Sequence, residues 1–339
     1  MTDRTNLARQ FLATAGWSGA DRAALAGDAS ARRYERLRLD GRPAVLMDAP
    51  PERGESTERF ARMADWLSGH GYSAPAILAA DHDAGFLLLE DLGDALVARL
   101  VAEDPKREPP LYAAATDFLA DLHRHAPPDF VAPLDGPALA EFVALTPRWY
   151  LPGIGAAETQ AGKSLPEQVA ETYRRLADPA MVTALRDFHA ENLIWLPDRK
   201  GPARLGLLDF QDAVVAHPAY DLVSLLQDAR RDVTPATEAE MLDRYTTATG
   251  RDADQFAAIY ALLGAQRALR IVGVFARLTL HFGKPHYLGY LPRVWGYLLR
   301  NLAHPALADL ARTVAEALPE PTPERVQRIK DQCGSYQTP

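Results

Sequence analysis

Residues 186–212 constrain the fold more than any other part of the chain. Two short apolar runs, residues 193–196 and 205–208, are separated by a turn that contains glycine and two prolines. Such a pattern is typical of two antiparallel strands joined as a β-hairpin. The rest of the chain must therefore provide a core on which this hairpin can pack.

Three oxygen-bearing side chains flank the two runs. Asp187 and Asn192 come just before the first run, and Asp209 follows the second. Because hairpin strands are antiparallel, we expect all three at one end of it. Each of them alone also suits a turn or a strand end. Together, an Asp, an Asn five residues later and a second Asp match kinase-type phosphoryl transfer, in which a base accompanies oxygen ligands of magnesium.

The composition excludes several classes of partner. The chain has 339 residues, of which 47% are hydrophobic, and its net charge is -8, so we expect a sizeable core in one large domain or two of ordinary size. An acidic balance argues against nucleic acid and against an anionic membrane surface. A small anionic ligand, bound in a local basic pocket, is still compatible with the acidic net charge. Cys333 is the only cysteine, so an internal disulfide and a thiolate metal cluster are excluded.

The chain lacks the patterns of a secreted or membrane-spanning protein. Its first residues lead into an amphipathic segment, not into a secretory apolar region. The longest apolar stretch, residues 259–282, contains a glutamine and three arginines, which is too polar for a membrane span. We expect a cytoplasmic protein with no membrane partner.

The order of the elements predicts two lobes. Three strands, a helix over residues 55–68 and two further strands are expected in residues 1–92, which form a small sheet lobe. The first of these strands is expected over residues 24–30 and ends in a tight loop. Residues 93–339 carry apolar residues mostly at helical spacing, interrupted by the hairpin. The fold class is therefore α+β, and the cleft between two lobes is the favoured place for a ligand.

Two motifs resemble those of a known family. Arg-Asp-Phe-His-Ala-Glu-Asn at residues 186–192 and Leu-Leu-Asp-Phe-Gln-Asp at residues 207–212 resemble the catalytic and metal motifs of the aminoglycoside phosphotransferase family, small-molecule kinases with a protein-kinase-like fold. Further segments are similar to one branch, the anomeric kinases of N-acetylmuramate and N-acetylglucosamine in bacterial cell-wall recycling. These segments are residues 27–34, 45–51, 85–93, 220–226 and 266–273.

The resemblance implies a role for each residue of the motifs. Asp187 would accept the proton of the anomeric hydroxyl, and Asn192 and Asp209 would hold Mg2+ across the phosphates of ATP. In the loop before the second strand, Ser30 would cover the phosphates. Adenine would bind between the lobes.

The adenine contacts implied by the resemblance are the carbonyl of Glu90 and the amide of Leu92. One expected residue is missing, because the family's phosphate-binding lysine on the third strand is replaced by Met47, a residue type that usually fills cores. We hypothesise that Arg32 or Arg33 supplies the missing charge. A second departure is Leu185, where the family's motif usually has a histidine.

Several residues have two interpretations. His189 either orients the loop or is a buried structural imidazole, and Asp221 either accepts N–H bonds of the catalytic loop or caps a helix. Asp212 would bind a sugar hydroxyl or a second metal, or lie in a solvated turn. A muramate carboxylate favours an arginine. The candidates are Arg148, which adjoins Trp149 and Tyr150, and three arginines spaced along one long helix, Arg267, Arg270 and Arg277.

The sequence thus predicts an ATP- and Mg2+-dependent kinase that phosphorylates the C1 hydroxyl of N-acetylmuramate and N-acetylglucosamine and acts as a monomer. One alternative is a kinase of another small alcohol, of the aminoglycoside or choline type. Another is a nucleotide-binding pseudokinase, which the missing lysine would allow and the intact Asp187, Asn192 and Asp209 oppose. The charge of the substrate pocket discriminates between the sugar kinase and an aminoglycoside kinase, because N-acetylmuramate needs a cation there and an aminoglycoside needs acidic residues.

Overall fold

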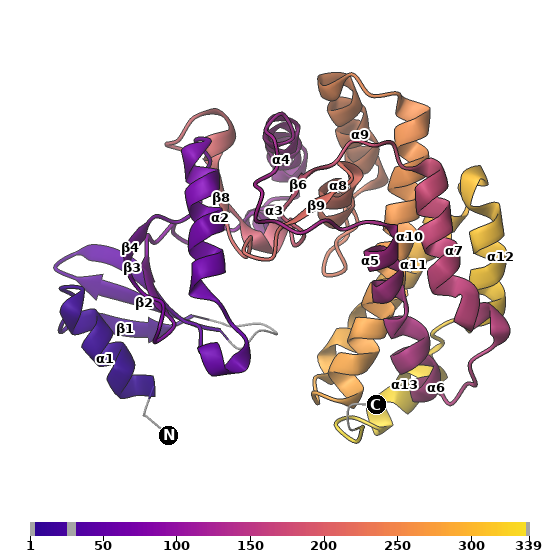
Figure 1. Cartoon of the computed structure of the whole chain (residues 1–339), viewed down its shortest axis with the longest axis horizontal. Coiled ribbons are helices and arrows are strands. Elements are labelled where there is room, and N and C mark those ends of the chain that lie inside the picture. The colour runs from indigo at the N-terminus through magenta and orange to yellow at the C-terminus, as the bar shows by residue number, and fades with distance from the viewer. Residues whose placement is uncertain (1–3, 26–31, 337–339) are drawn as a thin grey trace. The chain divides into compact units, whose positions relative to one another are not determined.

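The chain forms two compact units in a computed structural model that describes residues 4–25 and 32–336 (Figure 1). The sheet unit comprises Met1–Phe118 and Ala190–Ala213, and the helical unit comprises Leu119–His189 and Val214–Pro339. The boundary between lobes after residue 92 stays a prediction.

The sheet unit contains an antiparallel sheet with the strand order β1-β2-β3-β5-β4 in the described residues. Its strands are β1 (Asp21–Ala24), β2 (Arg33–Leu39), β3 (Arg42–Asp48), β4 (Ile77–Asp81) and β5 (Phe86–Leu89). Its helices are α1 (Arg4–Thr14), α2 (Thr57–Gly69), α3 (Val97–Glu103) and the first part of α4 (Glu108–Leu122). The predicted order of three strands, a helix and two strands is confirmed. The predicted position of the first strand is wrong, because β1 ends at Ala24, where that strand was expected to begin. Residues 26–31 of the expected strand lie outside the described residues.

One face of this sheet packs on α1. Phe11 of α1 stacks on Phe86 of β5 with ring centroids 5.7 Å apart, and Leu37 and Leu46 belong to the same core cluster. Because neighbouring residues of a strand point to opposite faces, Met47 points away from this cluster. Met47 is only 1% exposed, so the residue at the position of the missing lysine is a core residue, as the sequence indicated.

A two-stranded hairpin completes the sheet unit. It consists of β7 (Leu193–Trp195) and β8 (Leu205–Leu207), which pair antiparallel. The N–H of Leu207 donates to the carbonyl of Ser73 at 2.9 Å, and the N–H of Trp195 donates to the carbonyl of Ala95 at 2.8 Å. Main-chain bonds on both strands therefore fix the hairpin within this unit.

The helical unit is built from α5 to α13 and a short strand pair. Its helices are α5 (Gly136–Val143), α6 (Leu151–Ile154), α7 (Gln160–Leu176), α8 (Ala219–Leu226), α9 (Pro235–Thr249), α10 (Ala253–Leu280), α11 (Leu291–Leu302), α12 (Ala308–Ala317) and α13 (Pro323–Asp331). The strands β6 (Val182–Ala184) and β9 (Val214–Ala216) pair antiparallel. A π-helical turn at Thr146–Tyr150 joins α5 to α6.

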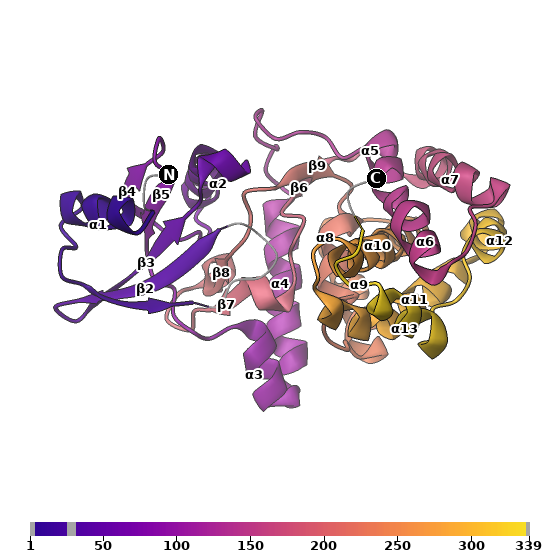
Figure 2. The ribbon, with the colours of Figure 1, turned by 90° about the horizontal axis from the view of Figure 1, so that it is seen from below.

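The long helix α10 is the core of the helical unit, where it contacts α5, α7, α8 and α11 (Figure 2). By length and composition alone it is apolar enough to cross a membrane, but 83% of its apolar window is buried inside the structure. Its apolar character is therefore that of a core helix. Gly273 allows a close approach, because an added Cβ would lie 2.5 Å from the main-chain carbon of Leu145.

Candidate active site

The hairpin brings Asn192 and Asp209 to the same end of the sheet unit. Leu193 at the start of β7 lies opposite Leu207 at the end of β8. The N–H of Leu208 donates to the carbonyl of Asn192 at 2.9 Å. The predicted hairpin is therefore confirmed, and an amide and a carboxylate flank its open end. That Asp187 joins them there stays a prediction, because Asp187 belongs to the helical unit.

Two donors hold the carboxylate of Asp209. Its φ of 56° lies in the left-handed region, which a non-glycine residue adopts only at an energetic cost. Its Oδ1 accepts bonds from Nη2 of Arg32 at 2.7 Å and from Nε2 of Gln211 at 2.8 Å. Within the described residues no donor bonds to Oδ2, so this oxygen is available to a cation.

The guanidinium of Arg32 links two carboxylates of the sheet unit. Its Nε lies 3.4 Å from Oε2 of Glu55, and its Nη2 bonds to Asp209. The side chain of Arg32 is only 9% exposed. Burial raises the pKa of the neighbouring Tyr34 to about 12, so its hydroxyl stays neutral at physiological pH. Glu55 was not predicted as a site residue, since an acidic residue ahead of a helix is common.

Asp187 lies in a cationic environment within the helical unit. Burial by itself would raise the pKa of its carboxyl. The charges of Arg267, Arg270 and Arg186 outweigh burial and hold that pKa below its usual value. Asp187 is therefore ionised at neutral pH, which is the form that accepts a proton.

Asp221 of α8 fixes the main chain that leads to Asp187. Its Oδ2 accepts the N–H of Leu185 at 2.5 Å, and its Oδ1 accepts the N–H of Arg186 at 2.9 Å. Burial raises the pKa of Asp221 to about 7, although the two main-chain bonds favour the carboxylate. Of the two interpretations of Asp221, the structure supports loop anchoring, because the N-cap of α8 is Pro218.

Two of the arginines near Asp187 share one aromatic ring. The guanidinium carbons of Arg270 and Arg186 lie 4.6 Å and 5.5 Å from the ring centroid of Phe142. Arg270 also donates to the hydroxyl of Tyr220 at 3.2 Å. A cation over an aromatic face is attracted by the ring quadrupole, so these contacts fix the direction of both guanidinium groups. Arg186, Arg267 and Arg270 are called the arginine group below.

His189 is a buried imidazole of the same loop, with 6% of its surface exposed. Its Nε2 lies 3.4 Å from Nη1 of Arg230. Burial is the main cause that lowers its pKa, so it is neutral at physiological pH. The interpretation as a structural imidazole therefore fits the structure better.

Side chains of the sheet unit fix the linker that follows β5. The Glu90 carboxylate pairs with Nη2 of Arg199 at 2.6 Å, and Nε of Arg36 pairs with Asp91 at 2.7 Å. Within the described residues the main-chain carbonyl of Glu90 and the main-chain amide of Leu92 form no hydrogen bond. The two main-chain groups predicted to bind adenine are thus available, and their role stays a prediction.

The remaining predicted residues are less informative. Ser30 lies outside the described residues. Arg33 is exposed at the start of β2. The side chain of Asp212 is 42% exposed and lies 3.4 Å from Nη1 of Arg59, an exposed pair of small energetic weight. The roles predicted for these residues stay predictions.

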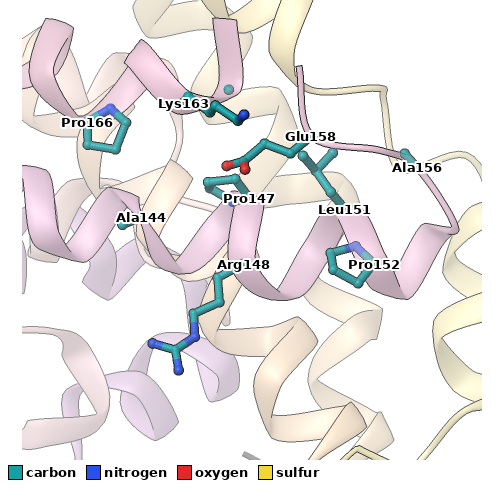
Figure 3. Close-up of a pocket in the computed structure, with 10 residues that line it drawn as sticks. Ala144, Pro147, Arg148, Leu151, Pro152, Ala156, Glu158, Lys163 and Pro166 are labelled. Carbon is teal, nitrogen blue, oxygen red and sulfur yellow. The ribbon is translucent and has the colours of Figure 1, made fainter. Parts of the chain in front are cut away.

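Arg148 lines a cavity of about 500 Å³ in the helical unit (Figure 3). The ends of Lys163 and Glu158 point toward one another there, whereas the guanidinium of Arg148 points away from them (Figure 3). The residues that line the cavity include no member of the arginine group around Asp187. A role of Arg148 in sugar binding therefore stays a prediction without support from this cavity.

The described residues contain no group of three His, Cys, Asp or Glu side chains that could hold a metal ion. Asn192 and Asp209 offer one amide and one carboxylate, both hard oxygen donors. Magnesium typically binds through one or two such groups, together with water and substrate phosphates. The donor set fits this ion.

Comparison with known proteins places this arrangement in a family. A family model described as the phosphotransferase enzyme family matches residues 21–259. The N-acetylmuramate/N-acetylglucosamine kinase of Caulobacter vibrioides is 42% identical, with 88% of this chain and 93% of the relative covered. The protein of the same name from Pseudomonas aeruginosa is 32% identical, with 86% and 87% covered.

Solved structures share the fold. A choline/ethanolamine kinase family protein of Mesorhizobium loti covers 97% of this chain and 100% of its own, with a TM-score of 0.63 and 14% identity. A type VIII aminoglycoside-3'-phosphotransferase covers 75% of this chain and 97% of its own, with a TM-score of 0.53 and 18% identity. At such identities the likeness concerns the fold alone, and it confirms the predicted kinase-like α+β fold.

Proposed function

Because the chain belongs to the phosphotransferase enzyme family, we propose that it is an ATP-dependent sugar kinase that phosphorylates the C1 hydroxyl of N-acetylmuramate and N-acetylglucosamine. Four relatives at 32–42% identity carry the name of such a kinase. The observation that carries the choice of substrate is the arginine group around Asp187. The reaction would take place in the cytoplasm, where ATP is available, as one step in the recycling of cell-wall sugars.

The proposed chemistry assigns one role to each motif residue. Asp187 accepts the proton of the sugar hydroxyl as that oxygen attacks the γ-phosphorus of ATP. The bond from this phosphorus to the β–γ bridging oxygen breaks, and ADP leaves with its electron pair. Asn192 and Asp209 hold magnesium, which neutralises part of the phosphate charge when it is bound. Little covalent chemistry falls to the protein, so positioning of the hydroxyl and charge stabilisation supply most of the acceleration.

The nucleotide is proposed to bind at the linker after β5. The carbonyl of Glu90 would accept a bond from the adenine amino group, and the amide of Leu92 would donate to a ring nitrogen. The pairs of Glu90 with Arg199 and of Asp91 with Arg36 support this role, because they fix the linker before ATP arrives. A binding segment that is already ordered loses less entropy on binding.

The arginine group favours an anionic substrate. N-acetylmuramate carries a lactyl carboxylate, and a guanidinium binds a carboxylate through two parallel hydrogen bonds. N-acetylglucosamine has no charge and would be accepted without this bond. An aminoglycoside or choline is a cation, and like charges at close range disfavour binding. The charge around Asp187 therefore argues against the alternative of a kinase for such alcohols.

The pseudokinase alternative rests on the missing lysine of the third strand. A scaffold protein that does not transfer phosphate has no need for an ionised base beside the arginine group. The lowered pKa of Asp187 therefore favours the enzyme.

An ATP-consumption assay over a panel of sugars tests the proposal. N-acetylmuramate and N-acetylglucosamine should support turnover, and their C1 methyl glycosides should not, because the methyl group removes the reacting hydroxyl. Kanamycin and choline serve as cationic acceptors. Turnover with a C1 methyl glycoside would contradict the assignment of the C1 hydroxyl, and turnover with choline alone would favour the alternative kinase.

A further inference from the structure

The third strand supplies no cation to a nucleotide in this protein. Met47 is buried in the sheet unit, and Asp48 forms an ion pair with Arg4. No lysine occurs among the first 105 residues of the sequence. A fixed positive charge that this part of the chain offers to the phosphates of ATP must therefore come from arginine.

Arg32 is placed where it could supply this positive charge to the phosphates. It directly precedes β2, next to the loop in which the sequence predicts phosphate contacts. Its Nη2 lies 2.7 Å from Oδ1 of Asp209, the proposed magnesium ligand, and its Nε lies 3.4 Å from Oε2 of Glu55. If Asp209 holds magnesium together with the phosphates of ATP, the guanidinium that bonds to Asp209 lies close to those phosphates.

Neighbouring arginines are less suited to this role. Arg33 begins β2 with an exposed side chain. Arg36 pairs with Asp91 and Asp94 of the linker, at 2.7 Å in both cases. Arg32 is the buried guanidinium that contacts the end of the hairpin.

We infer that Arg32 binds the phosphates of ATP in place of a lysine on the third strand, and that Glu55 positions it. The inference rests on the proposed function, since it requires ATP at this site. Before the nucleotide binds, Asp209 and Glu55 balance the charge of the buried guanidinium. Bound phosphates would replace Asp209 as the partner of Arg32, and Oδ1 of Asp209 would then be available to magnesium along with Oδ2.

The structure supports a separate role for Glu55. It immediately precedes Ser56, whose side chain caps α2 by accepting the N–H of Arg59 at 3.2 Å. The cap fixes the main chain next to Glu55, so the carboxylate approaches Nε of Arg32 from an ordered segment. A carboxylate on Nε leaves the far end of the guanidinium directed at Asp209. Glu55 is therefore a positioning residue that acts through Arg32.

Calorimetric titration with ATP and with adenosine, each in EDTA and in magnesium, tests the inference. Arg32→Ala should raise the Kd of ATP by about tenfold or more, as expected for the loss of bonds between charged groups, and should leave the Kd of adenosine unchanged. The Kd of ATP for Arg32→Lys should lie between those of Arg32→Ala and the unmodified protein, because lysine keeps the positive charge but lacks the paired N–H donors of a guanidinium. Arg38→Ala is the matched control, since it removes one exposed positive charge from β2, the strand that Arg32 precedes.

A double-mutant cycle tests the role of Glu55. Glu55→Gln should weaken ATP binding less than Arg32→Ala does. Added to Arg32→Ala, it should have no further effect, because Glu55 acts through a guanidinium that is no longer present. A fully additive effect in the double variant would overturn the positioning role of Glu55.

Three results would overturn the role of Arg32. One is an ATP Kd of Arg32→Ala within about twofold of the unmodified protein, a change that the loss of any surface charge can cause. Another is equal weakening of ATP and adenosine, which indicates a disrupted fold. The third is a loss of ATP binding in Arg33→Ala but not in Arg32→Ala. Absence of ATP binding in the unmodified protein would instead overturn the proposed function and this inference with it.

Discussion

The main-chain N–H of Arg186 donates to Oδ1 of Asp221 at 2.9 Å, and Arg186 has a φ of 73°. The adjacent N–H of Leu185 bonds to the other oxygen of the same carboxylate. A left-handed conformation is unfavourable for arginine and persists only where the surroundings fix it. Asp221, which is fully buried, therefore stabilises the strained turn that directly precedes Asp187.

Replacing Asp221 with asparagine should slow turnover. An amide has one acceptor oxygen, so one of the two N–H groups loses its acceptor and faces an NH2 group instead. We expect kcat to fall about 10- to 100-fold, the scale of a base displaced by roughly 1 Å, with little change in the Kd of ATP. Steady-state kinetics with calorimetric titration measure both. Ser224→Ala is the control, since its hydroxyl bonds to the Arg186 carbonyl at a longer 3.3 Å. Equal kcat in the two variants would contradict the role of Asp221.

Replacing Asp187 with asparagine should remove most activity. A neutral amide cannot accept the hydroxyl proton, and loss of a general base costs about 10²- to 10⁴-fold in turnover. Glu191→Gln removes one negative charge from the same loop at an exposed position and should have little effect. Single-turnover measurements with both variants check this prediction. Turnover of Asp187→Asn near that of the unmodified protein would refute the assignment of the base.

Replacing Arg270 with glutamine should change the preference between the two sugars. The change removes a charge that could bind the lactyl carboxylate, so the KM for N-acetylmuramate should rise about tenfold. The KM for N-acetylglucosamine, which has no carboxylate, should change little. Arg277→Gln is the control, because Arg277 lies on the same helix against Trp149 and Phe282. An equal rise in KM for both sugars would show a general defect and contradict carboxylate recognition by Arg270.

His217 should make stability depend on pH. Burial is the main cause that lowers its pKa to about 4, below the usual value near 6.5. Between these two values the unfolded chain binds more protons than the folded one, so the free energy of unfolding should rise with pH from about 4 to about 6.5 and then level off. The slope from one such group is about 1 kcal/mol per pH unit.

Urea unfolding of the unmodified protein and of His217→Asn, at several pH values from 4.5 to 7.5, measures this slope. Asparagine keeps an acceptor for the N–H of Ala219, which His217 now accepts at 3.1 Å. The raised pKa of Asp221 contributes a slope of opposite sign to both proteins, so their difference isolates His217. A difference that does not vary with pH would show that His217 has no such effect.

The local patterns of the sequence predicted much of the fold. The hairpin was predictable because two apolar runs and a Gly/Pro turn specify it without reference to distant residues. Met47 was predictable as core because it ends a continuous apolar run that begins at Ala44, and methionine usually fills cores. The strands β6 and β9 were not predicted. Each has three residues, too few for a periodicity, and they pair across about thirty positions of sequence.

Helix ends and side-chain pairing were predicted less well. The apolar spacing of residues 167–176, with Pro166 just before them, predicts a helix that begins near residue 167. The helix α7 instead begins at Gln160, where Thr159 caps it. The helix α13 was not predicted, since its only buried residue is Ile329 and the segment reads as polar. The contact of Arg32 with Asp209 joins residues 177 positions apart, and no local pattern specifies which arginine meets which carboxylate.

The lysine-free start of the chain has a practical consequence for chemical profiling. A nucleotide that carries an acyl group on its phosphates labels a kinase by acylating a lysine amine beside those phosphates. No lysine occurs in the first 105 residues of this protein, so such a probe would find no lysine amine to acylate in that segment. Arginine-selective dicarbonyl reagents, with protection by ATP as the readout, are the chemistry suited to a site of this composition.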